Sequence, residues 1–322
     1  MLFRSKSSLA LGCLAPALGG ERPDGRWKGL SGAAGAGVRT VVVDASPIGR
    51  TPHSVPATYS GLMPALRELF ARTPDARRLG FVPGHFSFNS NKGRCPACEG
   101  RGSTKVEMQF LPDLWLVCEE CDGRRYRPEV LEVLHRGRSV ADVLAMSVDE
   151  ALELLEHQPK LARILRALAD VGLGYLALGQ SSTTLSAGEA QRLKLAAELL
   201  EVQAGRRGVI LLDEPTTGLH PADVRQLVAV LQRLARAGNA VVVIEHDVDV
   251  LVRCDRLLEL GPGGGDEGGR VVTEGAPSAL AADPSSPTGP FLTPRAAGAV
   301  VRPRRRGGRK AAAAGAKREA TR

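Results

Sequence analysis

The sequence predicts an α/β fold built on a buried parallel sheet. Two short runs of β-forming apolar residues, at 209–212 and 240–244, have the length and composition of strands that are covered on both faces. Between them, residues 221–238 carry apolar side chains at the 3.6-residue spacing of an amphipathic helix. A strand, a helix and a second strand in this order predict a right-handed crossover between parallel neighbours.

Charged side chains follow both predicted strands. Asp213 and Glu214 come at the end of the first strand, and His246 follows the second. Ligands of parallel sheets gather at the carboxyl ends of the strands. An aspartate there can hold Mg²⁺ through a water molecule, and a neighbouring glutamate can orient or deprotonate the water that attacks a γ-phosphate. A strand end with solvated carboxylates is the simpler alternative, and the motifs described below weigh against it.

Positive charge is concentrated at the end of the chain. The formal net charge is +8, yet residues 295–322 hold ten Lys or Arg and one acidic residue, so the remainder is close to neutral. We expect residues 285–322 to form a disordered basic tail, which either contacts nucleic acid non-specifically or only aids solubility. No run approaches the ~18 apolar residues of a membrane span. The sequence therefore predicts no membrane contact and, with its free thiols and ATPase-like motifs, a cytoplasmic protein.

Residues 1–37 contain a degenerate phosphate-binding pattern or an uncertain segment. Lys6 and Ser7 stand as in the second half of a P-loop, where the Lys reaches the β- and γ-phosphates and the Ser binds Mg²⁺. The glycines that let a backbone cradle phosphates are missing before them. This indicates either the truncated end of a longer chain or a disabled nucleotide site. A rival interpretation is a signal peptide with an apolar region at 9–18 and Cys13 as a lipid site.

The next segment, residues 38–93, is predicted to begin the ATPase core and to lead into an insertion. Residues 41–44 (VVVD) form its first clear strand, whereas the propensities of residues 46–59 predict only a loop. Residues 61–71 have the spacing of an amphipathic helix.

Four of the six cysteines form two C-x2-C pairs, Cys95 with Cys98 and Cys118 with Cys121, separated by nineteen residues. Each pair presents two thiolates from one tight turn, and two such turns complete a tetrahedron around zinc. Four thiolates leave no open coordination position, so the expected Zn²⁺ is structural. Free thiols or disulfides are the alternatives to bound zinc. Residues 95–102 also resemble the cysteine-rich repeats of J-domain chaperones, which is an alternative for the family. Cys254 is expected to be a small core residue.

The zinc module is predicted to span residues 94–127 and to hold a hairpin at 101–117. Basic and aromatic side chains on this hairpin suit a nucleic acid backbone and its bases. The candidates for DNA contact are Lys105, Gln109, Phe110 and Trp115. The alternative is that Phe110 and Trp115 merely pack the small module.

Helices follow the zinc module. Residues 140–144, 148–156 and 161–171 indicate a helical lobe within 128–180, and Ser147 is expected to cap the second of these helices. Residues 185–189 (LSAGE) then open a helix that runs to about residue 202, with Ser186 and Glu189 in the spacing of a capping box. Helix N-termini bind anions, although a well-capped helix shows the same pattern without a ligand.

After His246 the sequence predicts a β-hairpin and a last helix. Residues 255–260 read as a strand, 261–269 as the turn and 270–274 as the partner strand. A short helix begins at Pro277.

Together the motifs of residues 181–284 resemble those of ATP-binding cassette (ABC) proteins. LSAGE resembles their signature, LLDEP the Walker B segment, TTGLH the D-loop, and His246 the switch histidine. In that family two such units face each other, so a second ABC half or a homodimer partner is implied, with ATP and Mg²⁺ as cofactors. The implied residues are Lys6, Ser7, Ser186, Ala187, Gly188 and Glu189 for nucleotide, Ser7 and Asp213 for magnesium, and Glu214 and His246 for catalysis.

A more specific resemblance covers residues 41–283. SPIGRTP at 46–52 and GHFSFN at 84–89 are similar to the carboxy-terminal half of the UvrA family, the damage sensors of the excinuclease in bacterial nucleotide excision repair. That family has Gln where this chain has Ala45, and Gly where it has Ala187. The resemblance implies an ABC-type core with an inserted helical signature domain and a four-cysteine zinc module.

The implied function is ATP-dependent recognition of damaged double-stranded DNA, followed by loading of the helicase-like excinuclease component UvrB and, through it, the nuclease UvrC. The same resemblance leaves two alternative functions open. One is a drug-resistance or self-protection ATPase of similar sequence, and the other is a catalytically inactive, zinc-stapled DNA-binding fragment. A transporter ATPase is disfavoured by the zinc module.

Overall fold

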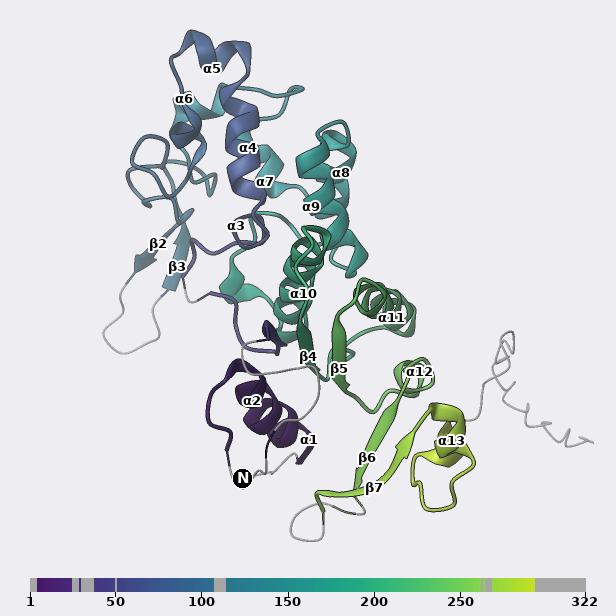
Figure 1. Ribbon diagram of the computed structural model, residues 1–322. Coiled ribbons are helices and arrows are strands. Elements are labelled where there is room, and N and C mark those ends of the chain that lie inside the picture. The colour runs from purple at the N-terminus through teal and green to yellow at the C-terminus, as the bar shows by residue number, and fades with distance from the viewer. Residues whose placement is uncertain are drawn as a thin grey trace, which may run out of the picture.

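A computed structural model describes residues 5–24, 29, 38–49, 51–106, 114–261, 263 and 268–292. Its centre is a three-stranded sheet in the order β1 (Thr40–Val43), β4 (Val209–Asp213) and β5 (Ala240–Ile244) (Figure 1). Both pairings are parallel, with Val43 opposite Leu212 and Asp213 opposite Ile244. The parallel sheet confirms the predicted α/β fold, and β4 is its buried middle strand.

Helix α11 (Pro221–Arg236) connects β4 to β5, as its apolar spacing predicts. Its buried side chains are Val224, Leu227, Val228, Val230, Leu231 and Leu234. The second long helix, α10 (Ala187–Gln203), begins at the LSAGE motif, and the short helix α12 (Val248–Leu251) follows β5. The strand ends therefore lie beside the starts of several helices.

A helical lobe lies above the sheet in Figure 1, and it is larger than the lobe predicted within 128–180 because the helices of residues 56–86 join it. Its elements are α3 (Pro56–Tyr59), α4 (Leu62–Ala71), α5 (Pro74–Arg78), η2 (Pro83–Phe86), α6 (Pro128–Leu131), α7 (Val140–Ala145), α8 (Val148–Leu155) and α9 (Pro159–Asp170). The predicted helices are confirmed, whereas α3 occupies a stretch predicted as loop. One apolar core joins the lobe to the sheet, from Phe70 and Phe86 to Ile210 and Leu212. Each fully buried side chain of this size stabilises the fold by about 1.5–3 kcal/mol.

The first described residues are helical, through α1 (Ser5–Ser7), a π-helical segment η1 (Ser8–Leu14) and α2 (Ala15–Gly19). Leu18 is buried and packs with Val209 and Leu211 of β4. Gly20 ends α2 in the left-handed conformation, with φ of 81°. The apolar stretch that also suggested a signal peptide thus packs against the sheet in this fold.

Two antiparallel hairpins complete the architecture. β2 (Ser103–Val106) pairs with β3 (Leu114–Val117) next to the paired cysteines. β6 (Leu257–Gly261) pairs with β7 (Arg270–Gly275), and α13 (Pro277–Ala281) follows. Both hairpins are as predicted, although β6 starts two residues later than expected.

The short helix η5 (Gly289–Phe291) ends the described chain. It lies in the stretch that composition assigns to the tail, yet Ser286 and Leu292 are buried. The basic residues of the predicted tail, from 295 on, lie outside the described residues. Among the described residues, no helix has the length and apolar character needed to cross a bilayer.

Candidate functional site

Ser7 and Asp213 meet at the carboxyl edge of the sheet. The Ser7 hydroxyl, in the first helical turn, donates a hydrogen bond of 3.0 Å to the Asp213 carboxylate at the end of β4. Both side chains are partly buried, and Lys6 is exposed beside them. Hard oxygen ligands of this kind, a hydroxyl and a carboxylate, suit Mg²⁺. The structure therefore brings together the two residues that the sequence assigns to magnesium.

Glu214 has an unusual backbone conformation directly after β4. Its φ is 47°, in the left-handed region that non-glycine residues rarely adopt. Its N–H donates to the carbonyl of Ile244 over 2.9 Å, which holds this residue between the ends of β4 and β5. Backbone strain of this kind costs about 1–3 kcal/mol and persists where surrounding structure enforces it. The strained position directs attention to Glu214 as a functional residue.

A buried carboxylate organises the loops around His246. Glu245 accepts hydrogen bonds from the N–H and the hydroxyl of Thr216, at 2.8 and 2.6 Å. It also accepts from the N–H groups of His246 and Asp247, at 3.0 and 3.3 Å. These four bonds join the segment after Glu214 to the segment that carries His246, whose side chain is exposed. The sequence analysis did not identify this role of Glu245.

The N-terminus of α10 has the predicted capping box. The Ser186 hydroxyl accepts from the N–H of Glu189 at 3.2 Å, and the Glu189 carboxylate accepts from the N–H of Ser186 at 2.7 Å. Ser186 and Ala187 are both exposed, so this helix end is open to solvent. A Cβ on Gly188 would lie only 3.3 Å from the carbonyl of Thr217, so a glycine suits this contact.

Further bonds hold Glu189 in its ionised form. Tyr175 donates to its carboxylate at 2.9 Å, and the Arg192 guanidinium donates to the Tyr175 hydroxyl at 3.3 Å. Burial alone would raise the pKa of Glu189, but the hydrogen bonds from Ser186 and Tyr175 together lower it below its usual value. The cap therefore carries a negative charge at neutral pH.

Two other side chains of α10 contact the strand ends, and sequence reasoning missed both. Gln191 is buried, and its amide donates to the carbonyls of Val43 at 3.1 Å and Asp213 at 2.7 Å. Lys194 binds the Asp44 carboxylate at 2.5 Å. Burial would raise the pKa of Asp44, but the hydrogen bonds from Lys194 and Ser46 together outweigh it, so this pKa is lowered. The spacing of three residues between Gln191 and Lys194 places both side chains on one face of the helix, but it does not show what that face contacts.

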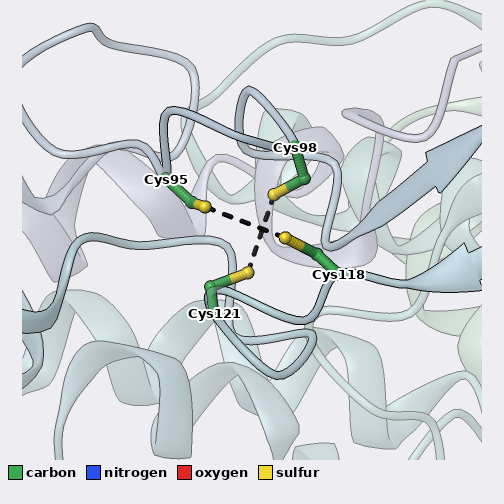
Figure 2. A group of neighbouring side chains, drawn as sticks. All are labelled: Cys95, Cys98, Cys118 and Cys121. Carbon is green, nitrogen blue, oxygen red and sulfur yellow. Dashed lines mark hydrogen bonds between the residues drawn. The ribbon is translucent and has the colours of Figure 1, made fainter.

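The four paired cysteines converge in one buried cluster (Figure 2). The sulfurs of Cys95 and Cys118 are 3.9 Å apart, those of Cys98 and Cys121 are 3.6 Å apart, and all four lie within 4.8 Å of one another. Four sulfurs bonded to one Zn²⁺ at about 2.3 Å would lie about 3.8 Å apart. The donor set and its dimensions fit a tetrahedral thiolate site.

The backbone around the cysteines is shaped for such a site. N–H groups of Gly102 and Arg125 point at the sulfurs of Cys98 and Cys121, each at 3.3 Å. Gly100 has φ of 83°, and a Cβ there would overlap the carbonyl of Phe88, so only glycine fits. Burial raises the pKa of the Cys121 thiol, and a bound cation reverses this preference by favouring the thiolate.

The hairpin beside the cluster exposes apolar side chains. Trp115 is 47% exposed and Val117 is 63% exposed, so Trp115 does not pack into a core as the alternative supposed. Lys105 is exposed on the opposing strand, where it pairs with Trp115. Gln109 and Phe110, the other two candidates for DNA contact, lie outside the described residues.

A cavity of about 450 Å³ lies between β5 and β6. Its lining is mainly apolar and includes Val241, Val243 and Leu258, together with Lys6. Asp213, Glu214 and His246 do not line it. Lys6 and Glu245 do line it, so the cavity adjoins the carboxyl edge of the sheet, although its walls are mainly apolar.

This chain is similar to proteins of known sequence and structure. A Thermus thermophilus protein, UvrABC system protein A, is 56% identical over 254 residues, which are 79% of this chain and 26% of that protein. The protein of the same name from Lactiplantibacillus plantarum is 52% identical over 274 residues, 85% of this chain and 28% of the relative.

A crystal structure of UvrA2 from Deinococcus radiodurans matches with a TM-score of 0.74 and 50% identity, over 79% of this chain and 31% of that one. No protein-family model matches the chain. The chain thus spans about a quarter of the length of the curated relatives it matches. The structural similarity supports the α/β fold of the ABC type that the motifs predict.

Proposed function

Because this chain is a partial member of the UvrA family, we propose that it takes part in ATP-dependent recognition of damaged DNA during bacterial nucleotide excision repair. The observation that carries the proposal is the hydrogen bond between Ser7 and Asp213. It joins the remaining part of a P-loop to the carboxylate that ends the buried strand. That arrangement suits a nucleotide site better than an ordinary strand end.

In this proposal ATP is hydrolysed at the carboxyl edge of the sheet, where Asp213 and Glu214 lie; we call this place the carboxylate edge. Ser7 and Asp213 hold Mg²⁺, which neutralises charge on the phosphates. Lys6 contacts the phosphate oxygens, and Glu214 orients or deprotonates the attacking water. His246 senses the γ-phosphate from the neighbouring strand end. The hydrogen bonds of Glu245 to Thr216 and His246 hold the segment after Glu214 beside the segment that carries His246.

The signature helix acts on a second nucleotide. The positive end of α10 faces a phosphate that is held by another ABC half or by a second copy of this chain. The residues at this helix end are Ser186, Ala187, Gly188 and Glu189. The methyl group of Ala187 lies at this open helix end, where it narrows the approach of a phosphate.

The cysteine cluster holds a structural Zn²⁺ that shapes a DNA-contacting hairpin. Lys105 and Trp115 are its described contact residues, with Gln109 and Phe110 as further candidates. Exposed aromatic and basic side chains suit stacking on bases and contact with phosphates. We expect this surface to respond to DNA shape and deformability more than to base edges.

The partners of the proposed function are damaged double-stranded DNA, the excinuclease component UvrB and, through it, UvrC. The proposed units are the core segments at 38–93 and 181–284, the zinc module at 94–127 and the helical signature lobe at 128–180. The whole assembly acts in the cytoplasm. Ser5 stands where a P-loop has the glycine before its lysine, which favours one alternative, an inactive zinc-stapled DNA-binding fragment.

DNA binding by the purified chain tests the proposal. Fluorescence anisotropy would compare a duplex that carries one bulky lesion with the same undamaged duplex, with and without Mg²⁺ and ATP. We expect tighter binding to the damaged duplex and a change in affinity with nucleotide, with strong salt dependence. Binding that ignores nucleotide supports the inactive fragment, and absence of any DNA binding contradicts both.

A further inference from the structure

One arginine occupies a glycine position in the cysteine cluster. The second turn of the cluster repeats the first, so Arg125 follows Cys121 as Gly102 follows Cys98. The two residues have the same backbone geometry, with φ of 72° for Arg125 and 79° for Gly102. Each also donates its N–H to the sulfur of the preceding cysteine over 3.3 Å. The backbone of the cluster thus requires a left-handed residue at both places.

A glycine would adopt this conformation without strain, whereas an arginine does not. The reason for an arginine must therefore lie in its side chain. The guanidinium of Arg125 donates from one nitrogen to the carbonyl of Gly179 at 3.0 Å and from the other to that of Pro52 at 3.4 Å. Its central carbon lies 5.3 Å from the centre of the Phe88 ring. The side chain is thereby held in one orientation.

The two carbonyls belong to segments that also meet each other. Pro52 lies in the loop after β1, and Gly179 lies in the turn before α10. Beyond the arginine, the N–H of Ser182 donates to the carbonyl of Ser54 at 2.8 Å, and the two hydroxyls bond at 3.0 Å. Ser182 is buried and lies four residues before the helix cap Ser186. Arg125 therefore bridges the segments that position the start of α10.

The backbone of Arg125 is fixed from both cysteine pairs. Its N–H is bound by the sulfur of Cys121, and its carbonyl accepts from the N–H of Cys95 at 2.9 Å. A metal that draws the four sulfurs together would also fix this backbone. Loss of the metal would release it, and the guanidinium would lose its position on Gly179.

We propose that Arg125 is a positioning residue that couples metal occupancy of the cysteine cluster to residues 179–186, the segment that leads into α10. The inference rests on the proposed metal centre and extends it, because it makes that centre a support of the nucleotide-facing helix end. A lysine would replace the arginine only in part, since its donors share one nitrogen and lack the planar fork that reaches two carbonyls from two nitrogens.

Substitution by glycine gives a sharp test, because it keeps the left-handed backbone and removes the side chain, with its bridge to the two carbonyls and its contact with Phe88. The complete chain would be compared with Arg125→Gly and Arg125→Lys, and with Arg124→Ala as the control at the neighbouring exposed arginine. Zinc content is measured with a colorimetric chelator. Amide hydrogen exchange of peptides containing Ser182 is measured before and after zinc is removed.

We expect Arg125→Gly to keep its zinc while exchange at Ser182 becomes about tenfold faster, the change expected when a hydrogen bond to a charged group is lost. Removing zinc from the unaltered chain should speed exchange at Ser182 by a similar factor. Removing zinc from Arg125→Gly should not speed this exchange any further. The exchange rate at Ser182 in Arg125→Lys should lie between those of the unaltered chain and Arg125→Gly. The rate in Arg124→Ala should match that of the unaltered chain.

Two results would overturn the coupling: zinc removal that still speeds exchange in Arg125→Gly, or exchange in that variant that matches the unaltered chain. Loss of zinc from Arg125→Gly would also contradict it, because the arginine would then serve the cluster itself. An unaltered chain that binds no zinc would instead refute the proposed metal centre, and the coupling with it.

Discussion

The hydroxyl of Ser7 and the carboxylate of Asp213, 206 positions apart in the chain, are joined by a hydrogen bond of 3.0 Å. Ser7 lies in a helix whose continuation packs Leu18 against β4, and Asp213 ends that same strand. The packing of the first helices on the sheet therefore brings the serine to the carboxylate edge. A pair of hard oxygen ligands at this edge is the feature around which the proposed nucleotide site is built.

Replacing Ser7 by alanine should weaken binding of ATP in the presence of Mg²⁺ by about tenfold, or about 1.4 kcal/mol, because one metal ligand is lost. Binding without Mg²⁺ should change little. Fluorescence of a labelled ATP analogue with and without Mg²⁺ measures both affinities.

Ser8→Ala is the matched control, since Ser8 is an exposed neighbour in the same helical start. It should leave the Mg²⁺-dependent affinity unchanged. Equal affinities for the Ser7→Ala variant and the unaltered chain would remove Ser7 from the magnesium site.

Replacing Cys95 by serine should remove about one bound zinc ion per chain, because three thiolates and a hydroxyl no longer form the closed tetrahedral site. The hairpin β2–β3 should loosen at the same time, since the cluster fixes both of its ends. Elemental analysis measures the first effect, and amide hydrogen exchange at residues 103–106 and 114–117 measures the second.

Cys254→Ser is the control for this experiment. Cys254 is half-buried, donates to the carbonyl of Val250 at 3.4 Å and lies apart from the cluster. Its replacement should leave the zinc content intact. A purified chain without zinc, in which all four clustered thiols react rapidly with a thiol reagent, would refute the metal centre.

Replacing Ser186 by alanine should lower the free energy of unfolding by about 1 kcal/mol, as the loss of an N-cap does. Ser147→Ala at the start of α8 is a matched control, because Ser147 and Glu150 form the same capping box, with the hydroxyl accepting at 3.3 Å. Both variants should lose similar stability in urea. Only Ser186→Ala should also impair nucleotide-dependent association, and equal behaviour of the two would argue against a role for this helix end.

The same cap should show a pH dependence. The pKa of folded Glu189 is lowered, so its ionised form contributes stability above the unfolded pKa of about 4.3 and loses that contribution as the pH falls. Glu189→Gln should therefore be less stable than the unaltered chain at pH 7, and the difference should shrink below about pH 4. A difference that stays constant with pH would contradict this assignment of charge.

Local patterns in the sequence predicted most of the fold. The apolar run before Asp213 predicted β4, the spacing of Ser186 and Glu189 predicted the start of α10, and the cysteine pairs predicted the cluster. Each of these signals lies within one element or one turn, so residue type and spacing suffice to read it. Helix α3 at Pro56–Tyr59 was missed because four residues carry no period.

Contacts between distant segments could not be predicted in the same way. Gln191 bonds the ends of β1 and β4, Glu245 joins Thr216 to His246, and Arg125 reaches Gly179. Each depends on how whole elements pack, and a single sequence contains no spacing that reports it. The helices at residues 5–19 were also missed, since their stability comes from packing on β4 and not from a regular apolar stripe.

ATP turnover by the purified chain, measured beside Glu214→Gln, tests the central claim most directly. We predict slow Mg²⁺-dependent hydrolysis that falls at least about 100-fold in the variant, because the residue that orients or deprotonates water is lost, while ATP binding is retained. Binding should be weak, since Ser5 stands where a P-loop has the glycine before its lysine. Absence of Mg²⁺-dependent ATP binding, or turnover that is equal in both proteins, would contradict the assignment of the carboxylate edge to ATP hydrolysis.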